Sequence, residues 1–203
     1  VTPNMKIKTH SKKVRHARRT VLKLLLAAHN VNCPECERNK NCELQELAEK
    51  HNITVNEYQT SPKPVSFEEA SPGVMRDNSR CIMCTRCVRT CEELQSVAVI
   101  KPVGRSAEVN ISTMMDRGLN EVPCTQCGQC INRCPTGALF ETSEIRQVWE
   151  AIEDPEKFVV IQTAPAVRVG IAEALGLPTD RSTGKMVAAI RGLGVDRVLD
   201  TDF

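Results

Sequence analysis

The eleven cysteines of this 203-residue chain fall into three tight groups, and one histidine completes the first group. The first group has the spacing H-x3-C-x2-C-x5-C, and the other two both have C-x2-C-x2-C-x3-C. Their members are His29, Cys33, Cys36 and Cys42; Cys81, Cys84, Cys87 and Cys91; and Cys124, Cys127, Cys130 and Cys134, with Pro135 next. No cysteine is left over. Ligands of this type at this density predict metal centres around which the chain folds.

The second and third groups have the spacing of bacterial two-cluster ferredoxins. Three thiolates on one tight loop reach three irons of a single 4Fe-4S cluster, whereas the fourth cysteine lies too far along the following helix and ligates the other cluster. The expected ligands of one cluster are Cys81, Cys84, Cys87 and Cys134, and those of the other are Cys124, Cys127, Cys130 and Cys91. Two adjacent clusters suit electron transfer.

Structural zinc and disulfides are the alternatives for these cysteines. Zinc sites usually pair two C-x2-C units across a longer gap and close at four ligands, which fits runs of four cysteines poorly. Disulfides are disfavoured by the odd cysteine count and by the absence of a secretory segment.

The histidine group lies between two predicted helices. Residues 11–29 have apolar side chains at helical spacing, which places His29 at the end of an amphipathic helix. Its apolar positions are Val14, Ala17, Val21, Leu22, Leu24, Leu25 and Ala28. A second helix, starting at Cys42 and including ELQELAEK, is expected to turn Leu44, Leu47 and Ala48 inwards. His29 is then the fourth ligand of a cluster, and its neutral imidazole raises the reduction potential. A zinc site with three cysteines and one histidine stays open as an alternative.

The last third of the chain predicts a helix and then a strand-helix-helix-strand unit. The helix covers 142–157, with Ser143 as N-cap and with Asp154 and Pro155 ending it. Its apolar face consists of Ile145, Val148, Trp149 and Ile152. The strands are FVVIQ from Phe158 and RVLD from Arg197, with helical patterning over 168–176 and 184–193. One such parallel pair cannot bury its own sheet, so further chain or a partner must cover it.

Composition and charge limit the other functions. Aromatic residues make up 3% of the chain, so cluster binding must supply much of the stability. Eight basic residues precede the first acidic residue, Glu35: Lys6, Lys8, Lys12, Lys13, Arg15, Arg18, Arg19 and Lys23. They form either a solvated helix face or a docking surface for an acidic redox partner. Scarce aromatics argue against nucleic acid binding, and no apolar run is long enough to span a membrane. His10, His16 and His51 have no assigned role.

Taken together, these motifs resemble the electron-input half of a modular FeFe-hydrogenase of the NAD(P)-linked or electron-bifurcating type. The tail from Thr163, TAPAVRVGIAEALGLP followed by TGKMVAAIRGLGVDRVLDTDF, is similar to the start of the hydrogenase catalytic domain. The resemblance implies three 4Fe-4S clusters here, and a 2Fe-2S cluster and the di-iron H-cluster elsewhere in the parent subunit. VTPNMKIKTH resembles the last strand of that 2Fe-2S domain, and the H-cluster cysteines are expected downstream because none follows Cys134. Implied partners are flavin- and iron-sulfur-bearing NAD(P)H dehydrogenase-type subunits or ferredoxin, in an anaerobic cytoplasm.

The expected fold class is α+β in successive modules. Residues 1–57 form the histidine-ligated module, 58–78 a linker, 79–140 a two-cluster ferredoxin domain, 141–157 a connecting helix, and 158–203 the start of an α/β hydrogenase domain. In the ferredoxin domain, the insertion between Cys91 and Cys124 is expected to form short strands at VAVI from Val97 and VNI from Val109. Two other functions compete: the iron-sulfur arm of an NAD-linked formate dehydrogenase or complex I-like subunit, and a stand-alone electron carrier.

Overall fold

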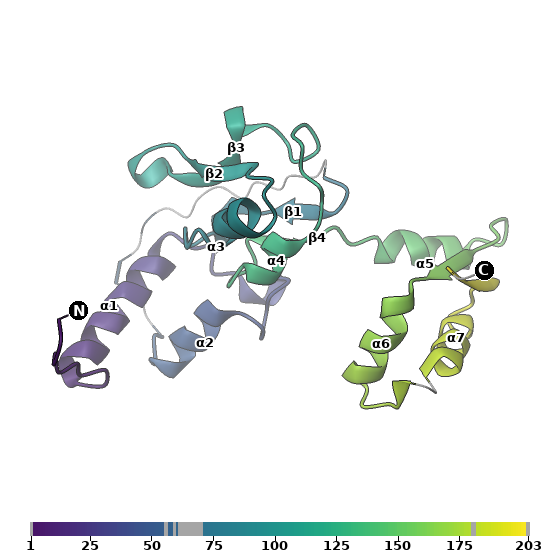
Figure 1. The fold of residues 1–203 in the computed structure, drawn as a ribbon, viewed down its shortest axis with the longest axis horizontal. Helices are drawn as coiled ribbons and strands as arrows, with labels where there is room; N and C mark the ends of the chain where they lie inside the picture. Colours follow the sequence, from purple (N-terminus) through teal and green to yellow (C-terminus); the bar gives the residue numbers. More distant parts are fainter. Residues whose placement is uncertain (1, 55–56, 59, 61–70, 180–181, 202–203) are drawn as a thin grey trace. The chain divides into compact units, whose positions relative to one another are not determined.

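The computed structural model describes residues 2–54, 57, 58, 60, 71–179 and 182–201. The chain forms two compact units, Val1–Thr142 and Ser143–Phe203, and each is described by itself (Figure 1). The first unit contains the helix pair of the histidine group and the segments that carry the other eight cysteines. Among the described residues, no helix has the length and apolarity needed to cross a membrane.

The helix pair comes first. Helix α1 covers Lys12–Ala27, with Ser11 as its N-cap accepting a hydrogen bond from the Val14 amide. After the 3-10 turn η1, Cys33–Glu35, helix α2 covers Glu43–Lys50. Both predicted helices are thus confirmed. In α1 and α2 the fully buried side chains are Leu22 and Leu44, and the guanidinium of Arg19 in α1 donates to the His51 carbonyl just beyond α2 at 2.8 Å.

Two details of this part of the prediction are wrong. Leu47 is exposed rather than turned inwards. In α1, the apolar side chains of Val21 and Leu24 are also more than half exposed. The two helices contact each other over a short stretch only, so part of each apolar stripe is left uncovered. Residues 2–10 contain no strand, in contrast to the expectation for the start of the chain. An isolated strand has unpaired backbone groups and is stable only beside a sheet neighbour.

The eight remaining cysteines lie around two small antiparallel sheets. Strand β1, Val74–Arg76, pairs with β4, Leu139–Glu141, so that the segment before the second cysteine group joins the segment after the third. Strands β2, Ile100–Val103, and β3, Asn110–Thr113, form a hairpin. The helical elements are η2, Asn78–Arg80; α3, Arg86–Arg89; the π-helical turn η3, Thr90–Leu94; η4, Ser106–Glu108; η5, Met114–Asp116; and α4, Gln129–Arg133. Strand β1 therefore lies inside the segment expected as a linker.

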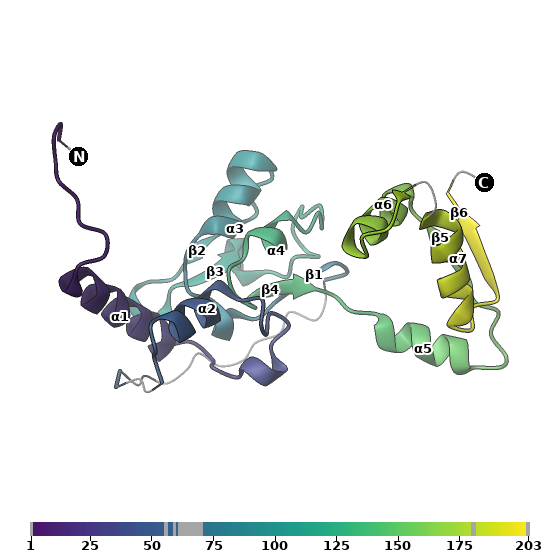
Figure 2. The same ribbon diagram turned by 90° about the horizontal axis from the view of Figure 1, so that it is seen from below.

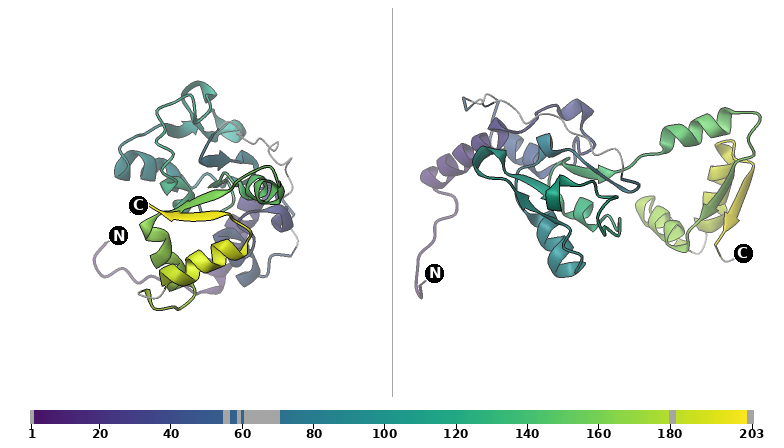
Figure 3. Two further views of the ribbon diagram at one scale, coloured as in Figure 1. Left: turned by 90° about the vertical axis from the view of Figure 1, so that its right-hand side faces the viewer. Right: turned by 90° about the horizontal axis from the view of Figure 1, so that it is seen from above.

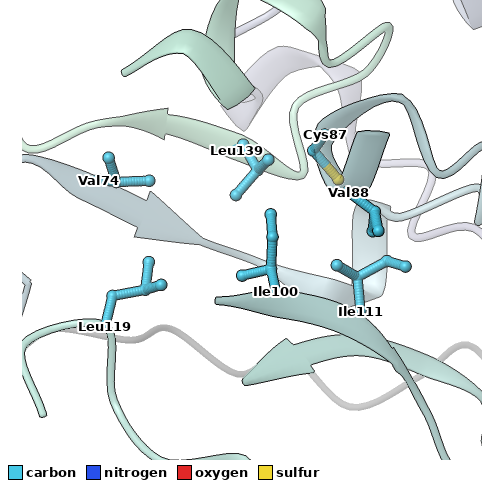
Figure 4. Packing of buried hydrophobic residues seen from close by; sticks show 7 residues of the cluster. All are labelled: Val74, Cys87, Val88, Ile100, Ile111, Leu119 and Leu139. Atoms are coloured by element: carbon cyan, nitrogen blue, oxygen red, sulfur yellow. The ribbon is translucent and has the colours of Figure 1, made fainter. Parts of the chain in front are cut away.

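The core of this region is small. Its buried members point towards one another from β1, α3, β2, β3 and β4 and from the loop before Cys124 (Figure 4): Val74, Cys87, Val88, Ile100, Ile111, Leu119 and Leu139. The two predicted short strands are only partly confirmed: β2 shares Ile100 alone with VAVI, and β3 begins one residue after the start of VNI. The amides of Val97 and Ala98 both donate to the Cys91 carbonyl, at 3.0 and 3.1 Å, so they end the π-helical turn and β2 starts only at Ile100.

The second unit begins with α5, Ile145–Glu153, followed by β5, Val160–Thr163, α6, Pro165–Ala174, α7, Ser182–Gly192, and β6, Arg197–Asp200. Strands β5 and β6 run parallel and side by side (Figure 2), and α6 and α7 lie on the same side of them (Figure 3). This confirms the predicted strand-helix-helix-strand unit. Ser143 is not the N-cap of α5: Glu144 holds that position without a side-chain bond, because the helix starts one residue later.

Candidate iron-sulfur site

All eight cysteines of the second and third groups line one internal cavity of the first unit. Its other walls include core side chains from all four strands of this unit's two sheets, namely Val74, Ile100, Ile111 and Leu139. Cys87 lies in α3, Cys91 in the π-helical turn, Cys130 in α4, and Cys134 at the C-terminal end of α4. The two repeated motifs therefore converge on a shared apolar interior, which is the arrangement that an interlocked pair of clusters requires.

Left-handed backbone at matching positions shapes the two cysteine loops. Met83 and Thr85 in the first loop have φ values of 57° and 58°, and Gln126 and Gly128 in the second have 54° and 69°. Each pair lies two residues after the first cysteine and one residue after the second cysteine of its motif. Positive φ is uncommon for residues other than glycine and costs energy for β-branched threonine. Both loops thus use the same turn to direct successive thiols into the cavity.

The thiols are held in a setting that favours their neutral form until a metal replaces the protons. Burial, followed by the charges of Cys81, Cys134 and Cys84, raises the pKa of Cys87 to about 12. Burial, followed by the charge of Cys124, raises the pKa of Cys130 to about 11. Cys134, although it belongs to the third motif, is therefore an electrostatic neighbour of the second motif. This proximity fits the crosswise ligation expected from the spacing.

The histidine group lies beside this cavity. His29, Cys33 and Cys42 line a second cavity, which Leu26 and Leu44 border from α1 and α2. Cys36 does not line it, and its Sγ instead faces Gly137, where a Cβ would overlap the sulfur. Burial and then the charges of Cys36 and Cys42 raise the pKa of Cys33, which shows that the three thiols are neighbours.

The imidazole of His29 is suited to ligation. Burial and then the positive charge of Arg80 lower its pKa, so the ring is neutral at physiological pH. Its Nδ1 is buried without a hydrogen-bond partner. A buried polar atom left unpaired is costly unless something outside the chain satisfies it, and a neutral imidazole nitrogen is a metal ligand. The residues present thus fit a bound iron-sulfur group.

Two further observations describe the metal chemistry of the structure. All eleven cysteines are free thiols. Within the described ranges, no three side chains of histidine, cysteine, aspartate or glutamate converge closely enough for a single metal ion. The cysteines instead border cavities, as a multi-iron group with ligands on its periphery requires.

Direct hydrogen bonds connect the histidine group to the ferredoxin-like part. The amide of Glu43, which follows Cys42, donates to the carbonyl of Pro135, which follows Cys134, at 3.0 Å. Arg38 donates to the Ile131 carbonyl at 2.8 Å, and Arg86 makes a two-point contact with the Glu43 carboxylate. The ligand loops of two predicted clusters are therefore joined through backbone that is one residue away from a cysteine on each side.

Sequence reasoning missed the buried polar turn between β1 and Cys81. Asp77 and Ser79 are fully buried and Arg80 nearly so. Asp77 lies in the segment expected to be a linker, and Ser79 and Arg80 follow at the start of the expected ferredoxin domain. The only available signal was the position of the polar run RDNSR directly before the second cysteine group.

Comparison with known families matches the chain in three successive parts. Residues 18–57 match the NADH-ubiquinone oxidoreductase-G iron-sulfur binding region, and residues 71–140 match the ferredoxin-like domain of NADH-quinone oxidoreductase subunit 3. Residues 157–203 match the C-terminal domain of the iron-only hydrogenase large subunit. The NADP-reducing hydrogenase subunit HndD of Solidesulfovibrio fructosivorans is 44% identical over the whole of this chain and 35% of its own length. The chain is therefore similar along its whole length to the iron-sulfur region of an FeFe-hydrogenase subunit.

Other proteins with similar sequence or structure are hydrogenases as well. Iron hydrogenase 1 of Clostridium pasteurianum is 31% identical over the whole chain and 36% of its own length, so the chain spans about a third of each of these relatives. A crystal structure of an NAD+-reducing [NiFe]-hydrogenase in the H2-reduced state superposes with a TM-score of 0.65 at 26% identity, covering 71% of this chain and 62% of that one. The chain thus corresponds to the iron-sulfur electron-transfer region of these hydrogenase subunits, and it is built from helices, strands and ferredoxin-like segments.

Proposed function

We propose that this chain conducts electrons through three 4Fe-4S clusters to or from the H-cluster of an FeFe-hydrogenase, within an NAD(P)H- or ferredoxin-linked complex. The observation that carries the proposal is the shared cavity lined by eight cysteines, with the histidine group hydrogen-bonded to its edge. Electron bifurcation by the complete complex is part of the same proposal.

The ligand sets follow the sequence motifs. The proposed sets are His29, Cys33, Cys36 and Cys42; Cys81, Cys84, Cys87 and Cys134; and Cys124, Cys127, Cys130 and Cys91. The second set is supported by the influence of Cys134 on the pKa of Cys87, and the first by the mutual influence of its thiols and by the unpaired His29 nitrogen.

The clusters, when bound, supply one-electron redox chemistry. The chain supplies thiolates at fixed positions, an apolar interior that excludes water, and short connections between neighbouring sites through bonds and hydrogen bonds. One of these runs from Cys42 to the Glu43 amide, across one hydrogen bond to the Pro135 carbonyl, and on to Cys134.

The parent subunit and its partners are inferred from the family. The matched hydrogenase domain at 157–203 favours a hydrogenase over the iron-sulfur arm of a formate dehydrogenase or complex I-like subunit. The name of the Solidesulfovibrio relative supports a link to NADP. The proposed partners are flavin- and iron-sulfur-bearing subunits or ferredoxin. Partly exposed apolar side chains of the second unit, including Phe158 and Leu175, suit cover by further hydrogenase domain. A stand-alone electron carrier is the remaining alternative.

Anaerobic quantification of iron and sulfide, with low-temperature electron paramagnetic resonance, tests the proposal. About twelve irons per chain, the number that three 4Fe-4S clusters need, with magnetic coupling between two clusters is the expected result. About eight irons with one bound zinc would contradict it and leave a two-cluster ferredoxin beside a structural zinc site.

A further inference from the structure

A fully buried ion pair lies between the histidine group and the ferredoxin-like cavity. The side chains of Asp77 and Arg80 are 0% and 7% exposed, and Arg80 Nε lies 3.1 Å from Asp77 Oδ2. Both atoms are buried and neither has a hydrogen-bond partner, so their contact is an ion pair without the alignment of a hydrogen bond. The other carboxylate oxygen, Oδ1, accepts from the Ser79 amide at 2.9 Å and the Ser79 hydroxyl at 2.6 Å.

Backbone bonds hold this pair rigidly on both sides. The Asp77 amide donates to the Ala138 carbonyl at 2.9 Å, and the Thr136 hydroxyl donates to the Arg80 carbonyl at 2.8 Å. Both partners belong to the segment that follows Cys134. From the side of the histidine group, the Asn30 amide donates to the Ser79 carbonyl at 2.9 Å. Asn30 follows His29 directly, so the pair is fixed to the ligand segments of two proposed clusters.

The cationic end of Arg80 faces the histidine group. One terminal nitrogen of its guanidinium lies 3.3 Å from the Glu35 carbonyl, in the turn between Cys33 and Cys36. A Cβ added at Gly137 would overlap the Cys36 sulfur and would lie 3.6 Å from the Cδ of Arg80, so Gly137 lies next to both residues. In keeping with this position, the charge of Arg80 influences the titration of both His29 and Cys33.

A buried ion pair is a poor source of stability, because removing two charges from water costs about as much as their attraction returns. Its position therefore calls for another explanation. Three thiolates and one neutral imidazole leave the site of the histidine group with a net negative charge that grows by one unit on reduction. A fixed cation at low dielectric stabilises that additional charge far more than a cation in water does.

We propose that Arg80 is a positioning residue that raises the reduction potential of the cluster held by His29, Cys33, Cys36 and Cys42, with Asp77 fixing its orientation and partly offsetting its charge. The inference rests on the proposed function, since it presupposes a cluster at the histidine group. It assigns to this buried pair the task of setting how readily that site accepts an electron.

The test compares two variants that share one change. Asp77→Asn keeps the oxygen that binds Ser79 and removes the negative charge. The double variant, Asp77→Asn with Arg80→Met, differs from Asp77→Asn only by the loss of the cation. Redox titration followed by electron paramagnetic resonance should show the midpoint potential of the His29 cluster rising in Asp77→Asn and falling in the double variant relative to Asp77→Asn. Equal potentials in the two variants would overturn the proposal.

A second comparison covers the case in which Asp77→Asn does not accumulate. Arg80→Lys keeps the charge and should stay closer in potential to the wild-type chain than the double variant, which leaves no charge unpaired. A double variant with the wild-type potential would overturn the proposal. Lys101→Gln is the matched control: its side chain is 45% exposed and pairs with the exposed Glu92, so solvent screens its charge and the His29 cluster signal should not shift.

Iron content separates this inference from the proposed function. Fewer than about twelve irons in the wild-type chain would overturn both, because no third cluster would be present. About twelve irons with a potential that does not respond to Arg80 would overturn the inference alone.

Discussion

Gly137 lies so close to Cys36 that a Cβ at this position would overlap the Cys36 sulfur, and the segment following Cys134 therefore reaches the histidine group. No residue with a side chain fits there without moving that sulfur. The contact makes the glycine a structural requirement of the first cysteine group, although it lies in the third cysteine group's segment.

The substitution Gly137→Ala is expected to displace Cys36 and to deplete the cluster of the histidine group. Iron content should fall from about twelve to about eight per chain, with the coupled signal of the ferredoxin pair retained. Gly170→Ala is the matched control, since nothing lies within 4 Å of a Cβ there and alanine in the interior of α6 should be neutral or stabilising by up to about 1 kcal/mol. An unchanged iron content in Gly137→Ala would show that Cys36 is not a ligand.

His29→Cys is expected to keep a cluster and to lower its reduction potential. A thiolate adds a negative charge where the neutral imidazole had none, which disfavours the reduced state. Redox titration of the His29 cluster signal measures the shift. If the titration curve of the variant overlays that of the wild-type chain, His29 is not a ligand.

Crosswise ligation predicts which cysteines act together. Cys134→Ala should alter the same paramagnetic signal as Cys84→Ala, and Cys91→Ala the same signal as Cys127→Ala, because each pair serves one cluster. The influence of Cys134 on the pKa of Cys87 supports the first pairing. Grouping of Cys134 with Cys127 instead would mean that each motif holds its own cluster.

Retention of the clusters should weaken as the pH falls. Burial raises the pKa of Cys87 to about 12 and that of Cys130 to about 11, so the cluster-free thiols stay protonated at neutral pH and binding must release protons. Iron release to a chelator should therefore accelerate as the pH falls from about 9 to about 6. A rate that does not change with pH would argue against thiol protonation as the competing step.

The same raised pKa values make the cluster-free chain less stable, not more stable, as the pH rises. Its folded state binds the thiol protons more tightly than the unfolded chain does, so this contribution to stability is complete below pH 9, the ordinary thiol value, and is lost as the pH rises towards 11 or 12. Thermal unfolding of cluster-free protein across this range measures it.

Several elements were predictable because they depend on nearby residues. The helix that follows Ser11, the parallel strands at Val160 and Arg197, and the end of α5 at Asp154 all follow from local periodicity and end signals. The N-cap at Ser143 was wrong because helix starts compete over one or two residues, and nothing nearby fixed the choice. The inward position of Leu47 was wrong because burial depends on a neighbour that periodicity does not name.

The sequence by itself determined the chemistry of this protein, since ligand type and spacing are covalent properties of short loops. Only the tertiary structure decided how those loops meet: Val74 in β1 opposite Glu141 in β4, the Glu43 amide on the Pro135 carbonyl, and Arg80 buried beside Asp77. The first two contacts join separate segments of the chain, and the third is buried because separate segments pack around it. Which partners meet depends on the packing of the whole unit, and no local pattern of residues encodes that.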